Sequence, residues 1–134
     1  MIKYRGGYEY QLAETYTVAL PEIDAELNVG NNYLRVRGGE LVVLEGYAWD
    51  GPSGPAIDTK NFMRGSLVHD ALYQLIREFL LPIAHREIAD RILRRLCLED
   101  GMSRLRAWWV YHGVRLGGGP AADPSADRPL LIAP

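Results

Sequence analysis

Four side chains able to take part in proton-transfer chemistry lie in two neighbouring segments with helical apolar periodicity. His69 and Tyr73 are four residues apart, so they share one face of a helix, and Asp70 lies about 100° around from them. Asp90 belongs to the next such segment, and an antiparallel return would bring its carboxylate to His69 or Tyr73. An imidazole beside an orienting carboxylate is the arrangement of a general base. We therefore predict a site in which His69, Asp90 and Tyr73 are catalytic.

A loop rich in glycine and proline precedes these segments and could supply oxygen ligands to a metal ion. Residues 46–55 read GYAWDGPSGP, a composition that exposes backbone carbonyls and permits unusual dihedral angles. Because Ca²⁺ takes six to eight oxygen ligands, this loop and one helix carboxylate would make a suitable cage. We predict metal ligands at Asp70, Asp50, Gly51 and Gly54. The alternative interpretation of the loop is a tight crossing from strand to helix.

Zinc is a second candidate for the metal, and no organic cofactor is predicted. Imidazole and carboxylate both suit Zn²⁺, so such an ion could be held by His69, Asp70, Asp90 and Asp50. No other histidine lies nearby at ligand spacing, so Ca²⁺ is the preferred ion.

The elements that must position these residues change from strands to helices near Gly51. Alternating and β-branched segments separated by turn residues predict strands at 8–12, 16–20, 33–37 and 41–44. Apolar positions three and four apart then predict helices at about 60–79, 84–98 and 103–116. Asp58 or Thr59 and Ser103 are suitable N-caps, and Pro82 interrupts the pattern. The predicted fold is α+β, an N-terminal antiparallel β-meander followed by three helices, with the site on the first two, antiparallel helices.

Length and composition indicate one modest domain. With 134 residues, of which 48% are hydrophobic, residues 1–117 are predicted to form a single α+β domain, and the Gly/Pro-rich residues 118–134 an extended tail. Fifteen basic and seventeen acidic residues give a net charge of -2 and no basic stripe for a phosphate backbone, so nucleic acid is not an expected partner. Cys97 is the single cysteine, which excludes an internal disulfide.

Neither a signal peptide nor a transmembrane segment is predicted. The first residues lack an apolar core, and the longest apolar run, residues 79–84, is far shorter than the roughly 20 residues that cross a bilayer. We expect synthesis in a cytoplasm.

Four sequence elements in order resemble a small family of uncharacterised proteins encoded by tailed bacteriophages and prophages. They are Asp50-Gly51-x-Ser53, His69-Asp70-x-Leu72-Tyr73, Ala89-Asp90 and Val114-Arg115-x-Gly117. This resemblance implies a phage origin, synthesis in the host cytoplasm, and phage structural proteins or host envelope components as partners. Association with the virion would fit the same origin.

A narrower resemblance covers about residues 46–93. The Gly-Pro-x-Gly loop at 51–54, His69-Asp70-x-x-Tyr73 and the later Asp90 are similar to the active-site scaffold of phospholipase A2, especially the disulfide-free form in parvovirus capsids. The resemblance implies that His69 activates water, Asp70 and the loop carbonyls hold Ca²⁺, Asp90 orients the histidine, and Tyr73 is a hydrogen-bond partner.

Two functions follow from these residues. The first is a metal-assisted hydrolase of an ester or related bond in the host envelope. The second is a non-catalytic virion or tail accessory protein in which the same side chains form a structural network. In that case the aspartates would pair with arginines of the helices, for which the candidates are Arg64, Arg77, Arg86 and Arg91.

A further basic group has two interpretations. It consists of Arg91, Arg94, Arg95, Arg104 and Arg106. These side chains are expected to form a solvated helix face, or else to meet anionic lipid headgroups or an acidic partner.

Overall fold

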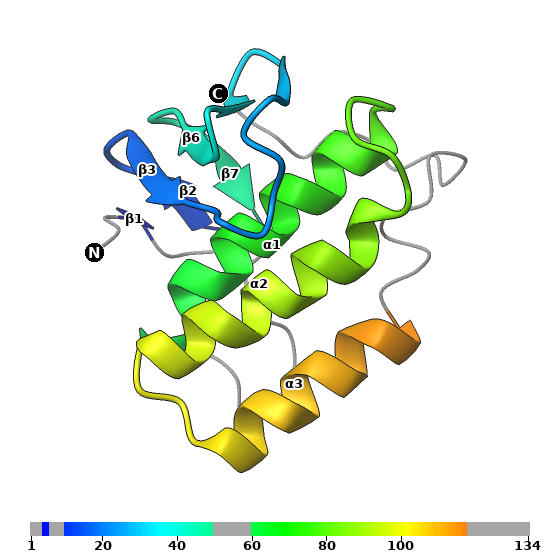
Figure 1. Ribbon diagram of the computed structural model, residues 1–134. Coiled ribbons are helices and arrows are strands. Elements are labelled where there is room, and N and C mark those ends of the chain that lie inside the picture. The colour runs from blue at the N-terminus through cyan, green and yellow to red at the C-terminus, as the bar shows by residue number, and fades with distance from the viewer. Residues whose placement is uncertain (1–3, 6–9, 50–59, 118–134) are drawn as a thin grey trace. The chain divides into compact units, whose positions relative to one another are not determined.

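The α+β prediction is confirmed by the computed structural model of the chain, which describes residues 4–5, 10–49 and 60–117 (Figure 1). The described residues fall into two compact units, one of strands and one of helices. The prediction of a single domain over residues 1–117 stays a prediction. The predicted tail, 118–134, lies outside the described residues.

The larger sheet of the strand unit has four antiparallel strands. In spatial order they are β3 (Tyr16–Ala19), β6 (Glu40–Val43), β5 (Leu34–Arg37) and β4 (Asn28–Gly30). The last three follow one another as a meander, whereas β3 pairs with β6. Arg37 is paired with Glu40, so Gly38 and Gly39 form a two-residue hairpin loop, and both have the positive φ that such loops need.

Three short strands form a second sheet in the order β1 (Tyr4–Arg5), β2 (Tyr10–Leu12) and β7 (Ala48–Trp49). The sequence analysis did not predict β1, β4 or β7, which have two or three residues each and are too short to show a period. In the longer strands the predicted alternation holds, because Leu34 and Val36 of β5 are buried while their neighbours are exposed.

Three helices make up the other unit, close to their predicted ranges. They are α1 (Lys60–Arg77), α2 (His85–Glu99) and α3 (Arg104–Gly117), and α2 packs against both of the others (Figure 1). The predicted N-cap of α3 is confirmed, since the Ser103 hydroxyl accepts the Arg106 N–H at 3.2 Å. The N-cap candidates Asp58 and Thr59 lie outside the described residues.

Helix α1 ends before the proline that was expected to break it. Arg77 is its last residue, and Phe79 takes a positive φ of 63°, a conformation that is uncommon for an aromatic residue. The N–H groups of Leu80 and Leu81 both reach the Leu75 carbonyl, so they satisfy the end of the helix. Pro82 therefore lies in the loop between α1 and α2.

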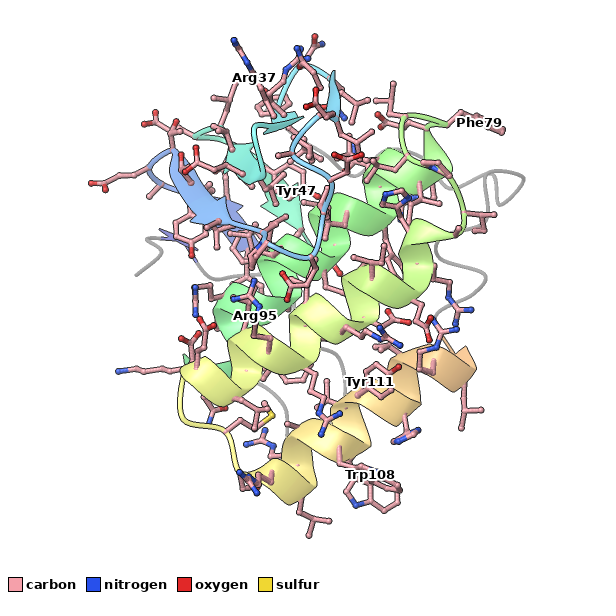
Figure 2. The ribbon with its side chains drawn as sticks, in the orientation of Figure 1. Arg37, Tyr47, Phe79, Arg95, Trp108 and Tyr111 are labelled. Carbon is pink, nitrogen blue, oxygen red and sulfur yellow. The ribbon has the colours of Figure 1, made fainter. Side chains whose placement is uncertain are left out.

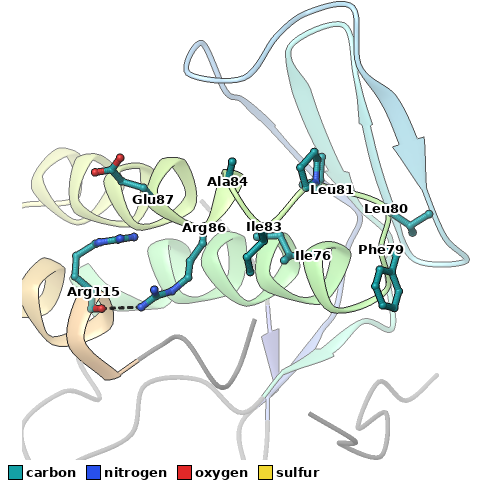
Figure 3. A pocket seen from close by; sticks show the side chains of 10 residues that line it. Ile76, Phe79, Leu80, Leu81, Ile83, Ala84, Arg86, Glu87 and Arg115 are labelled. Atoms are coloured by element: carbon teal, nitrogen blue, oxygen red, sulfur yellow. Dashed lines mark hydrogen bonds between the residues drawn. The ribbon is translucent and has the colours of Figure 1, made fainter. Parts of the chain in front are cut away.

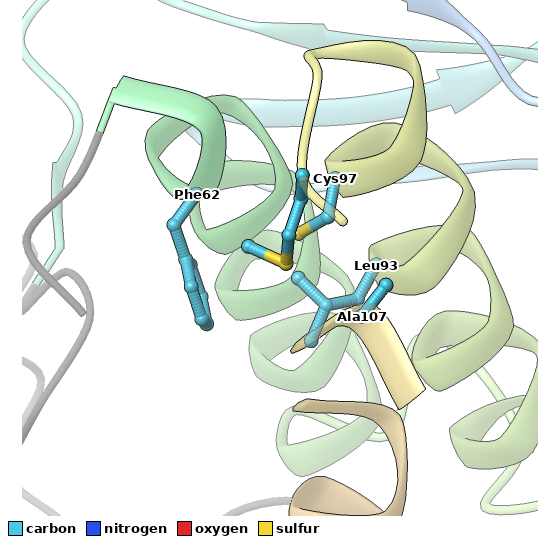
Figure 4. Close-up of a cluster of buried hydrophobic side chains, with 5 residues drawn as sticks. Phe62, Leu93, Cys97 and Ala107 are labelled. Carbon is cyan, nitrogen blue, oxygen red and sulfur yellow. The ribbon is translucent and has the colours of Figure 1, made fainter. Parts of the chain in front are cut away.

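A hydrophobic cluster of the helical unit lies where α1, α2 and the start of α3 meet. Its members are Phe62, Leu93, Cys97, Met102 and Ala107 (Figure 4). This cluster fixes the spacing and rotation of the helices beside the predicted site. Among the residues that the structure describes, no helix is long and apolar enough to cross a membrane.

Candidate functional site

Helices α1 and α2 run antiparallel, as predicted, and face each other through the candidate site. Arg64 of α1 pairs with Glu99 at the end of α2, whereas His69, further along α1, meets Asp90 near the start of α2. A Cβ atom on Gly65 would lie 3.0 Å from Leu93 Cδ1. The glycine thus permits a close approach of the two helices one turn before His69.

Asp90 is the centre of the site, and three side chains bind it. Its Oδ1 lies 2.7 Å from His69 Nε2 and accepts the Tyr73 hydroxyl at 2.5 Å, while its Oδ2 accepts Arg115 Nη1 at 2.9 Å. The Asp90 side chain is fully buried, and His69 and Tyr73 are nearly so. A buried carboxylate of this kind is tolerated only when its oxygens are hydrogen-bonded and its charge is paired.

The environment favours the ionised form of Asp90. Burial alone would raise the pKa of this carboxyl, but hydrogen bonds from His69 and Tyr73, with Arg115 on the other oxygen, hold it below its usual value of 3.8. Burial also raises the pKa of the Tyr73 hydroxyl, and the adjacent Asp90 charge adds to this effect. Tyr73 is therefore a neutral donor to Asp90.

His69 gains a raised pKa from the two aspartates beside it. Burial lowers the pKa of its imidazole, but the interactions with Asp70 and Asp90 outweigh burial and raise it above 6.5. Because the ionised Asp90 can only accept, it selects the tautomer of neutral His69 with the proton on Nε2. The lone pair of that tautomer is on Nδ1, which lies 3.9 Å from Asp70 Oδ1.

The structure thus brings the four predicted residues on the helices together, and their catalytic and metal-binding roles stay predictions. Asp90 contacts His69 and Tyr73, and Asp70 lies on the opposite side of the imidazole from Asp90 with 37% of its side chain exposed. A water molecule near Nδ1 would have a base on one side and a carboxylate within reach.

The predicted metal site lies only partly within the described residues. Asp70 is described, but the predicted ligands Asp50, Gly51 and Gly54 lie outside the described residues. Within the described ranges no group of three or more His, Cys, Asp or Glu side chains could hold a metal ion. One exposed carboxylate fits one ligand position of a calcium cage, and the other oxygens would have to come from the loop or from water.

Arg115 is the residue of the site that sequence reasoning did not predict. Of the arginines expected to pair with the aspartates, Arg64 binds Glu99 and Asp100, and Arg91 lies near Glu87. Arg86 instead donates to the carbonyls of Val114 and Arg115 at the end of α3. The position of Arg115 within the sequence element Val114-Arg115-x-Gly117 was the one sequence signal that could have singled it out.

An open hollow of about 860 Å³ lies at the end of α1 and the start of α2 and reaches the site at Arg115 (Figure 3). Its lining is mostly apolar, from the end of α1 and the loop that follows, and its polar members are Arg86, Glu87 and Arg115. Apolar hollows with a few polar groups are typical of ligand sites. Since Arg115 borders the hollow and also binds Asp90, the hollow adjoins the buried network.

Comparison with protein families matches residues 26–114 to the family described as "Protein of unknown function (DUF1353)". The matched range includes His69, Asp70, Tyr73 and Asp90. No curated protein and no solved structure matches the chain.

Proposed function

This chain belongs to the DUF1353 family, whose function is unknown, and we propose that it is a metal-assisted hydrolase in which His69 is the general base. The observation that supports this proposal is that the two ring nitrogens of His69 face two different carboxylates. Asp90 binds Nε2 at 2.7 Å from a buried position, and Nδ1 is directed toward the partly exposed Asp70. An acid that orients a histidine in this way is found in many sites of general-base catalysis.

In the proposed reaction Nδ1 of His69 takes a proton from water while the water oxygen attacks the carbonyl carbon of an ester. Asp90 stabilises the resulting imidazolium, which gives the proton to the leaving oxygen as the C–O bond breaks. Tyr73 and Arg115 keep the carboxylate of Asp90 in place. A Ca²⁺ ion bound at Asp70 would stabilise the negative charge that develops on the ester oxygen.

The substrate that we propose is an ester or related bond in the envelope of a bacterial host, hydrolysed by a protein of phage or prophage origin. The phage-like order of four sequence elements supports the origin, and the phospholipase-like His69-Asp70-x-x-Tyr73 with Asp90 supports the chemistry.

A phage virion or tail accessory protein without catalysis is the second candidate, and one observation favours it. Asp90 of α2 binds side chains of both α1 and α3, so the network ties the three helices of the unit together. Such a network would be retained for stability even if no reaction took place.

A metal titration of the wild type and of a variant at Asp70, the predicted metal ligand, distinguishes the hydrolase from the accessory protein. We would titrate metal-stripped protein with Ca²⁺ and with Zn²⁺ by calorimetry, beside an Asp70→Asn variant and the control Glu40→Gln, which removes an exposed carboxylate from β6. Saturable binding that Asp70→Asn abolishes and Glu40→Gln retains is the expected result. Binding of neither ion would refute the metal-assisted mechanism.

Activity then tests the base. Release of fatty acid from phosphatidylglycerol vesicles and hydrolysis of a p-nitrophenyl ester would be measured with His69→Gln, Asp90→Asn and Glu40→Gln. The hydrolase proposal expects activity in the wild type and in Glu40→Gln, and its loss in His69→Gln while that variant remains folded by circular dichroism. If loss of activity only follows loss of folding across the variants, the structural role is correct.

A further inference from the structure

Helix α3 presents a stripe of large apolar side chains to solvent. Leu105, Trp108, Trp109 and Leu116 are 70%, 47%, 65% and 89% exposed. At helical pitch these four positions lie within an arc of about 100°, and exposed His112 lies within the same arc. In Figure 2 the Trp108 ring points away from the helices.

This stripe is on the opposite side of α3 from the contacts that hold the helix in place. Ala107 is the buried residue of α3, and Val110 and Val114 pack against the hydrophobic cluster of the helical unit. The stripe exposes on the order of 500 Å² of apolar surface, taking aromatic and leucine side chains at their usual areas. Patches of that size on monomeric proteins are commonly binding surfaces.

Positive charge accompanies the stripe. The α3 sequence contains three arginines and no acidic residue, and Arg115 is occupied by Asp90. Arg104 and Arg106 precede and follow Leu105, so they flank the stripe on its two sides, roughly 100° away in each direction. From α2, exposed Arg94 lies over the ring of Tyr111, at 5.9 Å from its centroid.

Two acidic side chains lie just before α3, and both already have basic partners. Glu99 and Asp100, at the turn between α2 and α3, are paired with Arg64, and Glu99 also with Arg95. The stripe is therefore flanked by basic side chains, and Glu99 and Asp100 are paired with arginines of α1 and α2.

We infer that this face of α3 docks on the surface of an anionic phospholipid bilayer, with Trp108 and Trp109 inserted among the headgroups. Tryptophan prefers the boundary between headgroups and acyl chains, and helices with an apolar face and flanking arginines lie in that boundary. Exposed Arg104 would meet the lipid phosphates. A second copy of the chain suits the face less well than an anionic bilayer, because α3 has no acidic side chain that could pair with the arginines of a second α3.

The inference does not depend on the proposed hydrolase, because none of its residues belongs to the His69 site. The test is flotation of the full chain with vesicles of equal parts phosphatidylglycerol and phosphatidylcholine, compared with phosphatidylcholine alone, in EDTA. Tryptophan quenching by lipids brominated on the acyl chain would be recorded on the same samples. Trp49 is buried in the strand unit and provides a constant background.

One double variant, one single variant and one control define the expected result. Trp108→Ala with Trp109→Ala, and Arg104→Glu, should each weaken binding to the anionic vesicles about tenfold or more, and the first should lose the quenching. Arg37→Glu, the same single charge reversal on strand β5 of the strand unit, should stay within about twofold of the wild type. Melting curves would confirm that each variant is folded.

Three results would overturn the inference. They are no binding of the wild type to anionic vesicles, equal binding to phosphatidylcholine alone, and undiminished binding by the Trp108→Ala, Trp109→Ala variant. A dimer in sedimentation experiments that dissociates in this tryptophan variant, without lipid binding, would assign the face to a second copy instead.

Discussion

Replacing Asp90 by asparagine should be among the most destabilising changes that leave the volume of the helical unit unaltered. In the wild type Oδ1 receives His69 and Tyr73, and Oδ2 receives Arg115. An asparagine can place its oxygen toward His69 and Tyr73, but its amide N–H groups then face the guanidinium. If the amide is turned around, Arg115 is satisfied while Tyr73 and the imidazole must both reorient.

The magnitude follows from these contacts. A hydrogen bond to a charged group contributes about 1.5–3 kcal/mol, and the unpaired remainder of a buried ion pair adds a desolvation penalty. Arg115 has 30% of its side chain exposed, so it can turn toward water when its partner is lost. The hydrogen bond from Arg115 therefore contributes an amount near the lower limit of that range. We expect Asp90→Asn to lower the free energy of unfolding by about 2–4 kcal/mol near pH 6.

Urea unfolding followed by circular dichroism in EDTA measures this loss. Arg115→Gln removes the single hydrogen bond to Asp90 Oδ2 and should lower the free energy of unfolding by about 1 kcal/mol. The control Arg95→Gln removes an exposed pair with Glu99 four residues further along α2 and should cost less than about 0.5 kcal/mol. If Asp90→Asn costs no more than Arg95→Gln, the assignment of Asp90 as a buried, ionised centre is wrong.

The same variant should change the titration of His69. In the wild type Asp90 and Asp70 raise the pKa of the imidazole against the effect of burial. With asparagine at position 90, only Asp70 remains to oppose burial, so the pKa of His69 should fall, as followed by NMR titration of metal-free protein. An unchanged or higher pKa would contradict the proposed electrostatics.

Three further predictions follow from the same helices. Because the folded pKa of His69 is raised, its stabilisation is full below pH 6.5 and is lost as the pH rises through that folded value. The pKa of Asp90 is lowered, so the stabilisation from its carboxylate is full above about pH 3.8 and is lost as the pH falls through the folded value. The free energy of unfolding of the wild type should therefore exceed that of Asp90→Asn by the largest amount between about pH 4 and 6.5. Gly65→Val should lower stability by about 1–3 kcal/mol in thermal unfolding, since a Cβ there already lies 3.0 Å from Leu93, and an unchanged melting temperature would show that α1 and α2 separate easily. The thiol of Cys97 is buried and its pKa is raised to about 12, so it should react with a disulfide reagent only in denaturant, whereas rapid labelling of the native protein would mean that the cluster opens.

Much of the helical unit could be predicted from the sequence because its signals are local. The apolar period gave α1, α2 and α3 to within about two residues, and Ser103 was recognised as an N-cap from its type and position. Helical pitch alone placed His69 and Tyr73 on one face. The short strands β1, β4 and β7 were missed because two or three residues carry no detectable alternation.

The sequence by itself determined that an imidazole, a phenol and a carboxylate occur at positions that two antiparallel helices can bring together. Only the tertiary structure decided that both His69 and Tyr73 bind the same oxygen of Asp90, and that Arg115 binds the other. The partner of a buried charge depends on how far each helix is rotated and how closely the helices approach, here through Gly65. Those quantities are set by packing between residues distant in the chain, which no local period encodes.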